Sequence, residues 1–176
     1  MIDAGTAQWR RPTAGLIKGS PEDQIIKSGM DEIASMRLED GELRLQFVKL
    51  EPHPVHKAPT YFFRMVHAQT GAEFGGINLR AGSSVHIERY AGHIGYTVFP
   101  AFRGHRYAAR SLMLLIPAAR ILSLHVIWIT CDPENLSSRR SAELAGAKFA
   151  EIVEVPENCI IHQTGHPRKC RYRLDV

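Results

Sequence analysis

The second half of the chain alternates between extended and helical patterns, and this order restricts the folds that it can adopt. Residues 92–99 and 125–130 are rich in β-branched and aromatic side chains, which is typical of strands. Apolar residues at helical spacing follow each of them, over 106–120 and 135–144. Because a helix between two strands returns the chain to the same end of a sheet, we expect an α/β (α+β) domain whose mixed, partly parallel sheet is flanked by helices. The closing strand patterns are 149–155 and 170–174.

The first half predicts one helix followed by three strands. Ser20-Pro21-Glu22-Asp23 is a typical helix start, with a capping serine, a proline in the first turn and two acids near the positive end of the helix dipole. We expect this helix to end at Gly41. Two adjacent glycines, Gly75-Gly76, predict a bulge or the close approach of another backbone. The strand patterns are 43–48, 61–68 and 73–80.

A chain of 176 residues is long enough for one domain with its own core. Residues 1–19 show no periodicity, so we expect a flexible N-terminal arm followed by a single domain over 20–176. The longest nearly apolar run, Leu112–Ala119, contains Pro117 and is far shorter than the roughly 20 residues that cross a bilayer. The first residues lack an apolar signal segment, and three scattered cysteines are typical of reduced thiols. These features predict a cytoplasmic protein with no membrane partner.

Charge is unevenly distributed along the chain. The formal net charge is +4, but no Asp or Glu occurs from Arg89 to Cys131, a stretch that holds five arginines and three histidines. Such a stretch favours the binding of an anion. It has no lysine, no alternation of aromatic and basic residues, and no helix-turn-helix or zinc-finger spacing, so we do not favour nucleic acid as the partner. A small phosphorylated ligand fits this pattern better.

Residues 95–109, GYTVFPAFRGHRYAA, carry the strongest chemical pattern. A strand runs into Pro100, a short loop contains Gly104, and a helix follows. This arrangement points unpaired backbone N–H groups and the positive end of a helix dipole at one position. It therefore predicts a site for phosphate or pyrophosphate.

This loop resembles the coenzyme A loop of the GNAT acetyltransferase superfamily, Arg/Gln-x-x-Gly-x-Gly/Ala at the start of a central helix. Arg103, Tyr107 and Ala108 stand where that family has its arginine, aromatic and small residue. The segment Asn135–Gly146 resembles the Asn-x-x-Ser and Glu-x-x-Gly element of the branch that acetylates the N-termini of ribosomal proteins. The resemblance extends over about residues 43–175. It implies a GNAT-like acyl-CoA N-acyltransferase fold, with the central sheet splayed between its fourth and fifth strands.

By this resemblance, the chain binds acetyl-CoA and needs no metal. The pantetheine arm would lie between the splayed strands and pair with the backbone around Tyr96, Thr97 and Val98. Asn135 would bond the pantetheine or a catalytic water, and Ser138 would reach the phosphate end of the cofactor. The pyrophosphate would lie on the loop residues Arg103, Gly104, His105, Arg106, Tyr107 and Ala108.

Two positions depart from the family pattern. Arg106 stands where relatives usually have glycine, and it either donates a charge to the phosphates or blocks their access to the backbone. Ala142 stands where many relatives place a tyrosine as general acid, a residue that is also commonly missing in the Asn-x-x-Ser branch.

Acetyl transfer to an amine needs a base, a donor to the developing oxyanion and an acid for the thiolate. His93 is the first candidate for the base, and Glu88, acting through water, is the second. The alternative for His93 is a histidine held by a core or turn hydrogen bond. Ser138 and Ser141 are candidate acids, or else residues that cap and back-bond a helix. A backbone N–H near Tyr96 or Thr97 is the expected oxyanion donor.

Cys159, His162, His166 and Cys170 have a spacing that superficially resembles a zinc site. The same segment also fits two strand ends and their loop, with the turn at residues 164–167. We therefore expect no metal, and His162 and His166 become candidates for contact with the substrate.

The sequence thus predicts an acetyl-CoA-dependent N-acetyltransferase that acts on a primary amine by direct attack in a ternary complex. The sequence does not decide whether the acceptor amine belongs to a small molecule or to the N-terminus of a peptide or protein. It also allows assembly as a homodimer. Two alternatives remain. Arg106 and Ala142 favour a catalytically degenerate module that binds or senses acyl-CoA, and the acid-free stretch favours a protein that binds nucleic acid.

Overall fold

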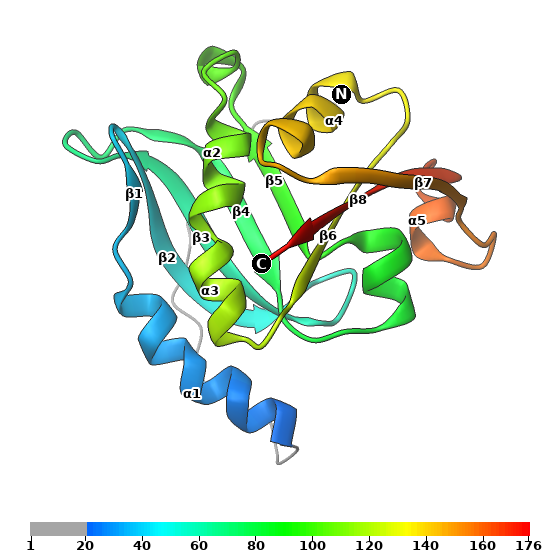
Figure 1. Ribbon diagram of the computed structural model, residues 1–176, viewed down its shortest axis with the longest axis horizontal. Helices are drawn as coiled ribbons and strands as arrows, with labels where there is room; N and C mark the ends of the chain where they lie inside the picture. Colours follow the sequence, from blue (N-terminus) through cyan, green and yellow to red (C-terminus); the bar gives the residue numbers. More distant parts are fainter. Residues whose placement is uncertain (1–20) are drawn as a thin grey trace.

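The computed structural model describes residues 21–176, which form two antiparallel sheets and the helices that pack on them (Figure 1). The predicted α/β class, with helices flanking the sheet, is confirmed. The loose arm expected over residues 1–19 and the helix cap expected at Ser20 lie outside the described residues. None of the helices over residues 21–176 is long and apolar enough to cross a membrane.

The first helix, α1 (Pro21–Ser35), is shorter than the sequence predicts. It ends before Gly41 because Leu38–Asp40 forms a strand, β1, that pairs with β2 (Leu43–Pro52). Gly41 makes the turn between these two strands with a φ of +58°, which glycine adopts without strain. The prediction of a helix as far as Gly41 is therefore wrong.

Three further strands, β3 (Pro59–His67), β4 (Glu73–Arg80) and β5 (Ile94–Val98), complete a five-stranded sheet in the order β1-β2-β3-β4-β5. The predicted bulge lies at Gly75, where the β3–β4 register shifts and φ is +152°. A Cβ at Gly75 would lie 2.1 Å from the carbonyl oxygen of Thr97. Glycine therefore allows β4 to approach β5 closely at this point.

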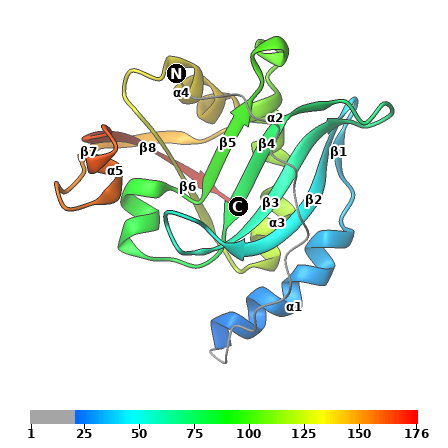
Figure 2. The ribbon, with the colours of Figure 1, turned by 180° about the vertical axis from the view of Figure 1, so that it is seen from behind.

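The second sheet consists of β6 (Val126–Cys131), β8 (Arg168–Asp175) and β7 (Lys148–Glu154), in the order β6-β8-β7. All strand pairs within residues 21–176 are antiparallel, so the expected parallel pairing is wrong. The reason is that β5 and β6 form no ladder: the His93 N–H, just before β5, donates to the carbonyl of Trp128 in the middle of β6 (2.7 Å). Beyond this point the two strands diverge (Figures 1 and 2), which confirms the predicted splay.

The helical segment predicted over 106–120, where Pro117 was expected to kink or end the helix, consists of two helices. These are α2 (Tyr107–Leu114) and α3 (Ile116–Ile121), which separate at Leu115 because Pro117 lies in the first turn of α3. They cover one face of the five-stranded sheet (Figures 1 and 2). The fully buried side chains of this core include Leu43, Leu79, Leu112, Leu115 and Ile127.

The remaining elements surround the open side of the splay. Helix α4 (Leu136–Leu144) follows β6 and was predicted, whereas three short helices were not. These are a π-helix, η1 (Ile87–Ala91), a 3-10 helix, η2 (Pro100–Phe102), and α5 (Ile160–Gln163).

Candidate active site

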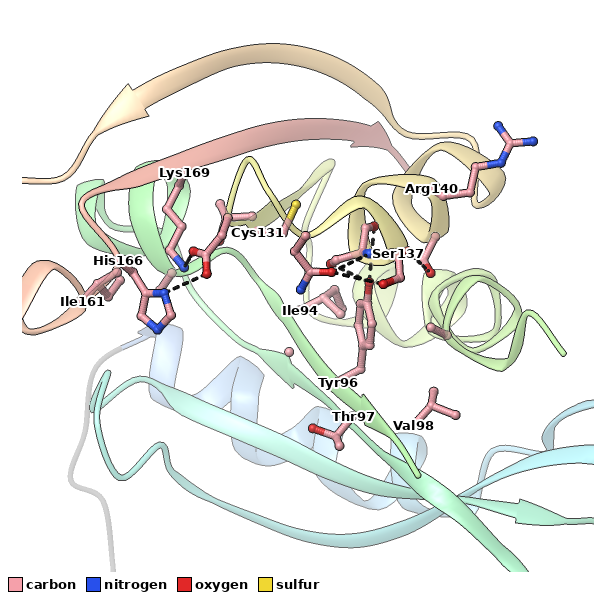
Figure 3. A pocket seen from close by; sticks show the side chains of 18 of the residues that line it. Ile94, Tyr96, Thr97, Val98, Cys131, Ser137, Arg140, Ile161, His166 and Lys169 are labelled. Carbon is pink, nitrogen blue, oxygen red and sulfur yellow. Dashed lines mark hydrogen bonds and ion pairs between the residues drawn. The ribbon is translucent and has the colours of Figure 1, made fainter. Parts of the chain in front are cut away.

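A cavity of about 1050 Å³ opens where β5 and β6 diverge (Figure 3). One part of its wall is β5 itself, the loop that follows it, the end of β6 and the first turns of α4. The other part is formed by the β2–β3 loop, η1 and the region from α5 to β8. One cavity therefore connects the loop that resembles a coenzyme A site with residues far from it in the sequence.

The loop between β5 and α2 offers free backbone donors to this cavity. The N–H groups of residues 104–108 have no backbone acceptor within the described chain. Helix α2 begins at Tyr107, which brings the positive end of its dipole to the same place. Arg103 Nε donates to the Val98 carbonyl (3.2 Å) and ties the loop to the end of β5. These groups fit a phosphate or pyrophosphate.

Arg106 adopts a left-handed backbone conformation, with a φ of +59° and a ψ of +19°. Such a conformation costs an L-residue other than glycine on the order of 1–2 kcal/mol. This cost is a physical reason for the glycine that the family resemblance leads us to expect at this position. The side chain of Arg106 is exposed and lines the cavity.

One arginine of the acid-free stretch, Arg110, is paired with carboxylates. Arg110 binds Asp40 through Nε and Glu42 through Nη1, each at 2.7 Å. Neither Arg103 nor Arg106 forms an ion pair with a carboxylate of the described residues. Both arginines of the loop therefore keep a positive charge that is available to an anion.

The edge of β5 also belongs to the cavity. β5 is the last strand of its sheet, and β6 contacts only its start, so the backbone of β5 presents a free edge. Tyr96, Thr97 and Val98 all line the cavity, as do Gly104, Tyr107 and Ala108. His105 does not: it is exposed, and its ring stacks on that of Tyr107 with centroids 5.5 Å apart. The contribution of His105 to the loop is therefore its backbone N–H and not its ring.

Asn135 and Ser138 lie together at the start of α4. The Asn135 Oδ1 accepts the N–H of Ser138 (3.0 Å) and caps the helix. The Ser138 Oγ lies 2.7 Å from the hydroxyl of Tyr96, which joins α4 to β5 across the splay (Figure 3). Burial raises the pKa of Tyr96, so its phenol keeps its proton. Ser141 also lines the cavity, but its hydroxyl donates back to the Ser137 carbonyl (2.8 Å).

Cys131, at the end of β6, lines the cavity beside this pair. Burial raises the pKa of its thiol to about 11. Because the thiolate is the nucleophilic form, this cysteine is a buried apolar residue at neutral pH rather than a nucleophile.

The two candidate bases from the sequence, His93 and Glu88, lie outside the cavity. His93 is 1 % exposed, and its Nδ1 accepts the N–H of Trp128 (3.0 Å). Burial and the charge of Arg80 lower the pKa of His93 to about 4. Glu88 lies on η1 and accepts a hydrogen bond from the Ser83 hydroxyl. The geometry thus supports the structural alternative for His93, because its ring joins β5 to β6 at the point where they meet.

We expect His93→Ala to lower the free energy of unfolding by about 2 kcal/mol, because it leaves the Trp128 N–H without its acceptor. Turnover of the folded variant should stay within threefold of the wild type. Denaturant unfolding and steady-state kinetics on the same preparation measure both quantities. A hundredfold loss of kcat with unchanged stability would instead return His93 to the role of general base.

A histidine–aspartate pair, His166 and Asp132, lies at the other end of the cavity. The sequence analysis named His166 as a candidate but missed Asp132. His166 Nδ1 is 2.7 Å from Asp132 Oδ2, and Lys169 Nζ is 2.6 Å from Asp132 Oδ1 (Figure 3). Burial by itself raises the pKa of Asp132, but its contacts with Lys169 and His166 bring it below the ordinary value. All three residues line the cavity. An ionised carboxylate that orients an imidazole is a typical arrangement for a general base.

Three more histidines, His53, His56 and His86, cluster around Arg80 beside this end of the cavity. The rings of His53 and His56 stack with centroids 4.6 Å apart, and His56 Nδ1 lies 2.9 Å from His86 Nε2. Burial, followed by the charge of Arg80, lowers the pKa of His53 to about 4 and of His56 to about 3, and it also lowers the pKa of His86. The cluster is therefore neutral at pH 7.

These histidines predict that the protein loses stability as the pH falls from about 6.5 toward 4. In the unfolded chain each ring takes up a proton near pH 6.5, whereas the folded pKa values of His53, His56 and His93 lie at or below about 4. Proton uptake therefore favours unfolding throughout this interval. Denaturant unfolding at pH 7, 6 and 5 should show a falling free energy, above the range where most carboxylates titrate. Equal values at pH 7 and pH 5 would contradict the prediction.

The residues with zinc-like spacing are divided among separate contacts. Cys170 lies in β8 opposite Cys131, His166 binds Asp132, and the Cys159 sulfur lies 3.8 Å from His86 Nδ1. Within residues 21–176, no group of three or more His, Cys, Asp or Glu side chains is placed to hold a metal ion.

Solved structures of acetyltransferases share this fold. A Vibrio cholerae protein assigned as a ribosomal-protein-serine acetyltransferase superimposes with a TM-score of 0.57 at 16% identity, over 81% of this chain and 99% of that one. The ribosomal-protein-S5-alanine acetyltransferase of Vibrio fischeri gives 0.52 at 14% identity, and the microcin C7 self-immunity acetyltransferase MccE gives 0.50 at 15%. Both of these matches cover 66% of this chain and 61% of the other. At such identities the likeness concerns the fold alone.

Among curated proteins, no sequence matches this chain. The family model described as an acetyltransferase (GNAT) domain matches residues 36–148. This range is more than half of the chain, and it contains β5, β6, the loop between β5 and α2, and the start of α4. The chain therefore belongs to the GNAT acetyltransferase family.

Proposed function

We propose that the protein transfers an acetyl group from acetyl-CoA to a primary amine, by direct attack of the amine in a ternary complex. The observation that carries this proposal is one cavity that connects the free N–H groups of residues 104–108 with the His166–Asp132 pair. The first end suits a pyrophosphate and the second offers a base to an amine. The names of the ribosomal-protein acetyltransferases among the structural neighbours, and the complex of MccE with acetyl-CoA and AMP, support the same reaction class.

The residues suited to hold acetyl-CoA lie at the α2 end. The N–H groups of residues 104–108 and the side chain of Arg106 suit its phosphates, and the free edge of β5 suits its pantetheine arm. Asn135 uses its Oδ1 for the helix cap, so its amide nitrogen remains to donate a hydrogen bond. When bound, acetyl-CoA supplies the acetyl group as an activated thioester.

His166 acts as the base in this proposal. Its Nδ1 carries the ring proton and donates a hydrogen bond to ionised Asp132. Nε2 is then free to accept a proton from the acceptor amine. Lys169 balances the charge of the carboxylate and holds it in place. Histidine 93 has no part in this step.

Ser138 and Tyr96 hold the proton on the thiolate side. Ser138 Oγ gives its proton to the departing thiolate and takes one from Tyr96, whose hydroxyl is 2.7 Å away, and the Tyr96 phenolate then regains a proton from solvent in the cavity. Burial favours the neutral phenol of Tyr96, so the pair holds its proton at neutral pH until the thiolate departs. Ser141 is not assigned as the acid, because its hydroxyl is bonded to the Ser137 carbonyl.

Acetyl-CoA is expected to raise the melting temperature of the protein. At about 100 times the dissociation constant, a ligand of the folded state adds roughly 2.7 kcal/mol, which corresponds to a shift on the order of 5–10 °C for a domain of this length. Free thiol should then be released only when a primary amine is added. Dephospho-CoA is the matched ligand, and we expect nearly the same shift because the pyrophosphate and pantetheine provide most of the contacts.

Other outcomes of this experiment select the alternatives. A thermal shift with no thiol release from any amine would favour a module that binds or senses acyl-CoA, in line with the buried Ala142 in place of a tyrosine. The absence of any shift would contradict the proposal.

Nucleic acid binding loses support because Arg110 of the acid-free stretch is already paired with carboxylates. A reducing compartment such as the cytoplasm suits the three free cysteines.

A further inference from the structure

Arg80, at the end of β4, is a buried cation without a buried counter-charge. It is 5 % exposed, and no carboxylate of the described residues forms an ion pair with it. Its Nη1 donates to the carbonyl of Gly92 (3.0 Å), and its Nη2 lies 3.4 Å from His53 Nε2. Its Nε is buried and has no hydrogen-bond partner in the described chain. Arg171 differs from Arg80 in this respect, because it is also buried but forms an ion pair with Glu151.

The groups around Arg80 do not compensate its charge. They are the histidines His53, His56, His86 and His93, whose pKa values are lowered by burial and also by the charge of Arg80 itself. Burial lowers the pKa of Arg80 to about 10, so its guanidinium is still charged at pH 7. A buried charge with neutral neighbours is costly unless something binds to it.

Arg80 lies at the acceptor end of the cavity. It lines the wall together with His56, whose pKa is lowered by burial and by the charges of both Arg80 and Lys169. A Cβ added to Gly95 would lie 3.0 Å from Arg80 Nη2, so the guanidinium reaches β5 next to Tyr96. Lys169 is already paired with Asp132, whereas Arg80 has no such partner among the described residues. The positive charge that is free to attract a ligand at this end is therefore that of Arg80.

We propose that Arg80, with His56 beside it, binds a carboxylate of the acceptor close to the amine that is acetylated. This inference rests on the proposed function and adds to it the class of substrate, an amine that also carries an acidic group. A guanidinium binds a carboxylate strongly through charge-assisted hydrogen bonds, and that of Arg80 lines the cavity without a carboxylate partner among the described residues. The acceptor would then be an amino acid, or a peptide with an acidic residue next to its N-terminus.

The test compares acceptors that differ in one charge. Alanine is compared with alaninamide, and Ala-Asp-amide with Ala-Asn-amide, by kcat/KM for thiol release. We expect at least a tenfold preference for the carboxylate in one pair, because a site built for a charged group rejects the neutral analogue. Arg80→Met should abolish that preference. Arg64→Met is the matched control, since Arg64 on β3 is paired with Glu73 and lies outside the cavity.

A second readout does not depend on turnover or on the folding of Arg80→Met. N-acetylalanine should raise the melting temperature of the wild-type protein more than N-acetylalaninamide does, and Arg80→Lys should keep part of that difference. Equal kcat/KM values within both pairs, or equal thermal shifts, would overturn the carboxylate site and leave acetyl transfer intact. A preference for 1-aminoethylphosphonate over alanine would also overturn it. The absence of thiol release from every amine would refute the proposed function, and the thermal shifts would still decide on Arg80.

Discussion

Replacing His166 with alanine is expected to lower kcat for acetyl transfer about 10²- to 10³-fold, within the usual range for loss of a general base. The affinity for acetyl-CoA should stay within twofold, because His166 lies at the end of the cavity opposite the loop of residues 104–108. His166→Ala activity should rise with pH, since a larger share of the amine is then already deprotonated. Steady-state kinetics from pH 6 to 10, with acetyl-CoA binding measured in parallel, provide the data.

His162→Ala is the matched control for this experiment. His162 lies in α5, four residues before His166, but it does not line the cavity. We therefore expect its kcat to remain within threefold of the wild type. A His166→Ala variant that is as active as His162→Ala would show that another group removes the proton.

Changing Arg106 to glycine is expected to weaken acetyl-CoA binding roughly tenfold or more, because a charge-assisted contact to phosphate is lost. Stability should change little. Relief of the left-handed conformation, with its φ of +59°, favours the variant, but the greater freedom of glycine in the unfolded chain opposes it by a similar amount. Calorimetric titration with acetyl-CoA and thermal unfolding of the free protein measure the two effects separately.

The variant Arg106→Ala distinguishes the effect of the guanidinium charge from the effect of the β-carbon. Alanine keeps the β-carbon and the backbone strain and removes only the guanidinium, so both variants should bind acetyl-CoA more weakly if Arg106 contacts phosphate. If the β-carbon obstructs the loop, Arg106→Gly binds more tightly than the wild type and Arg106→Ala does not. The second result would contradict the role that we give to Arg106.

Most strands and the loop between β5 and α2 could be predicted because their determinants are local. The alternation of apolar residues, the turn glycines and the Asn135 cap involve residues only a few positions apart. The end of α1 could not be predicted in this way. Leu38 gains more from pairing with β2 and entering the core than from continuing a helix, and that gain depends on a sheet that forms elsewhere in the chain.

The sequence by itself determined where most strands and the helices α2 and α4 lie, because neighbouring residues meet the hydrogen-bonding needs of these segments. The splay between β5 and β6 was implied by the family resemblance. Only the tertiary structure decided which side chains face the cavity. The ring of His93 points at the backbone of β6 and not at the substrate, since β5 and β6 meet at Trp128. Asp132 and His166 are 34 positions apart, and they meet because β6 and β8 pair with Cys131 opposite Cys170. Such contacts depend on the register between strands, which no local pattern in the chain specifies.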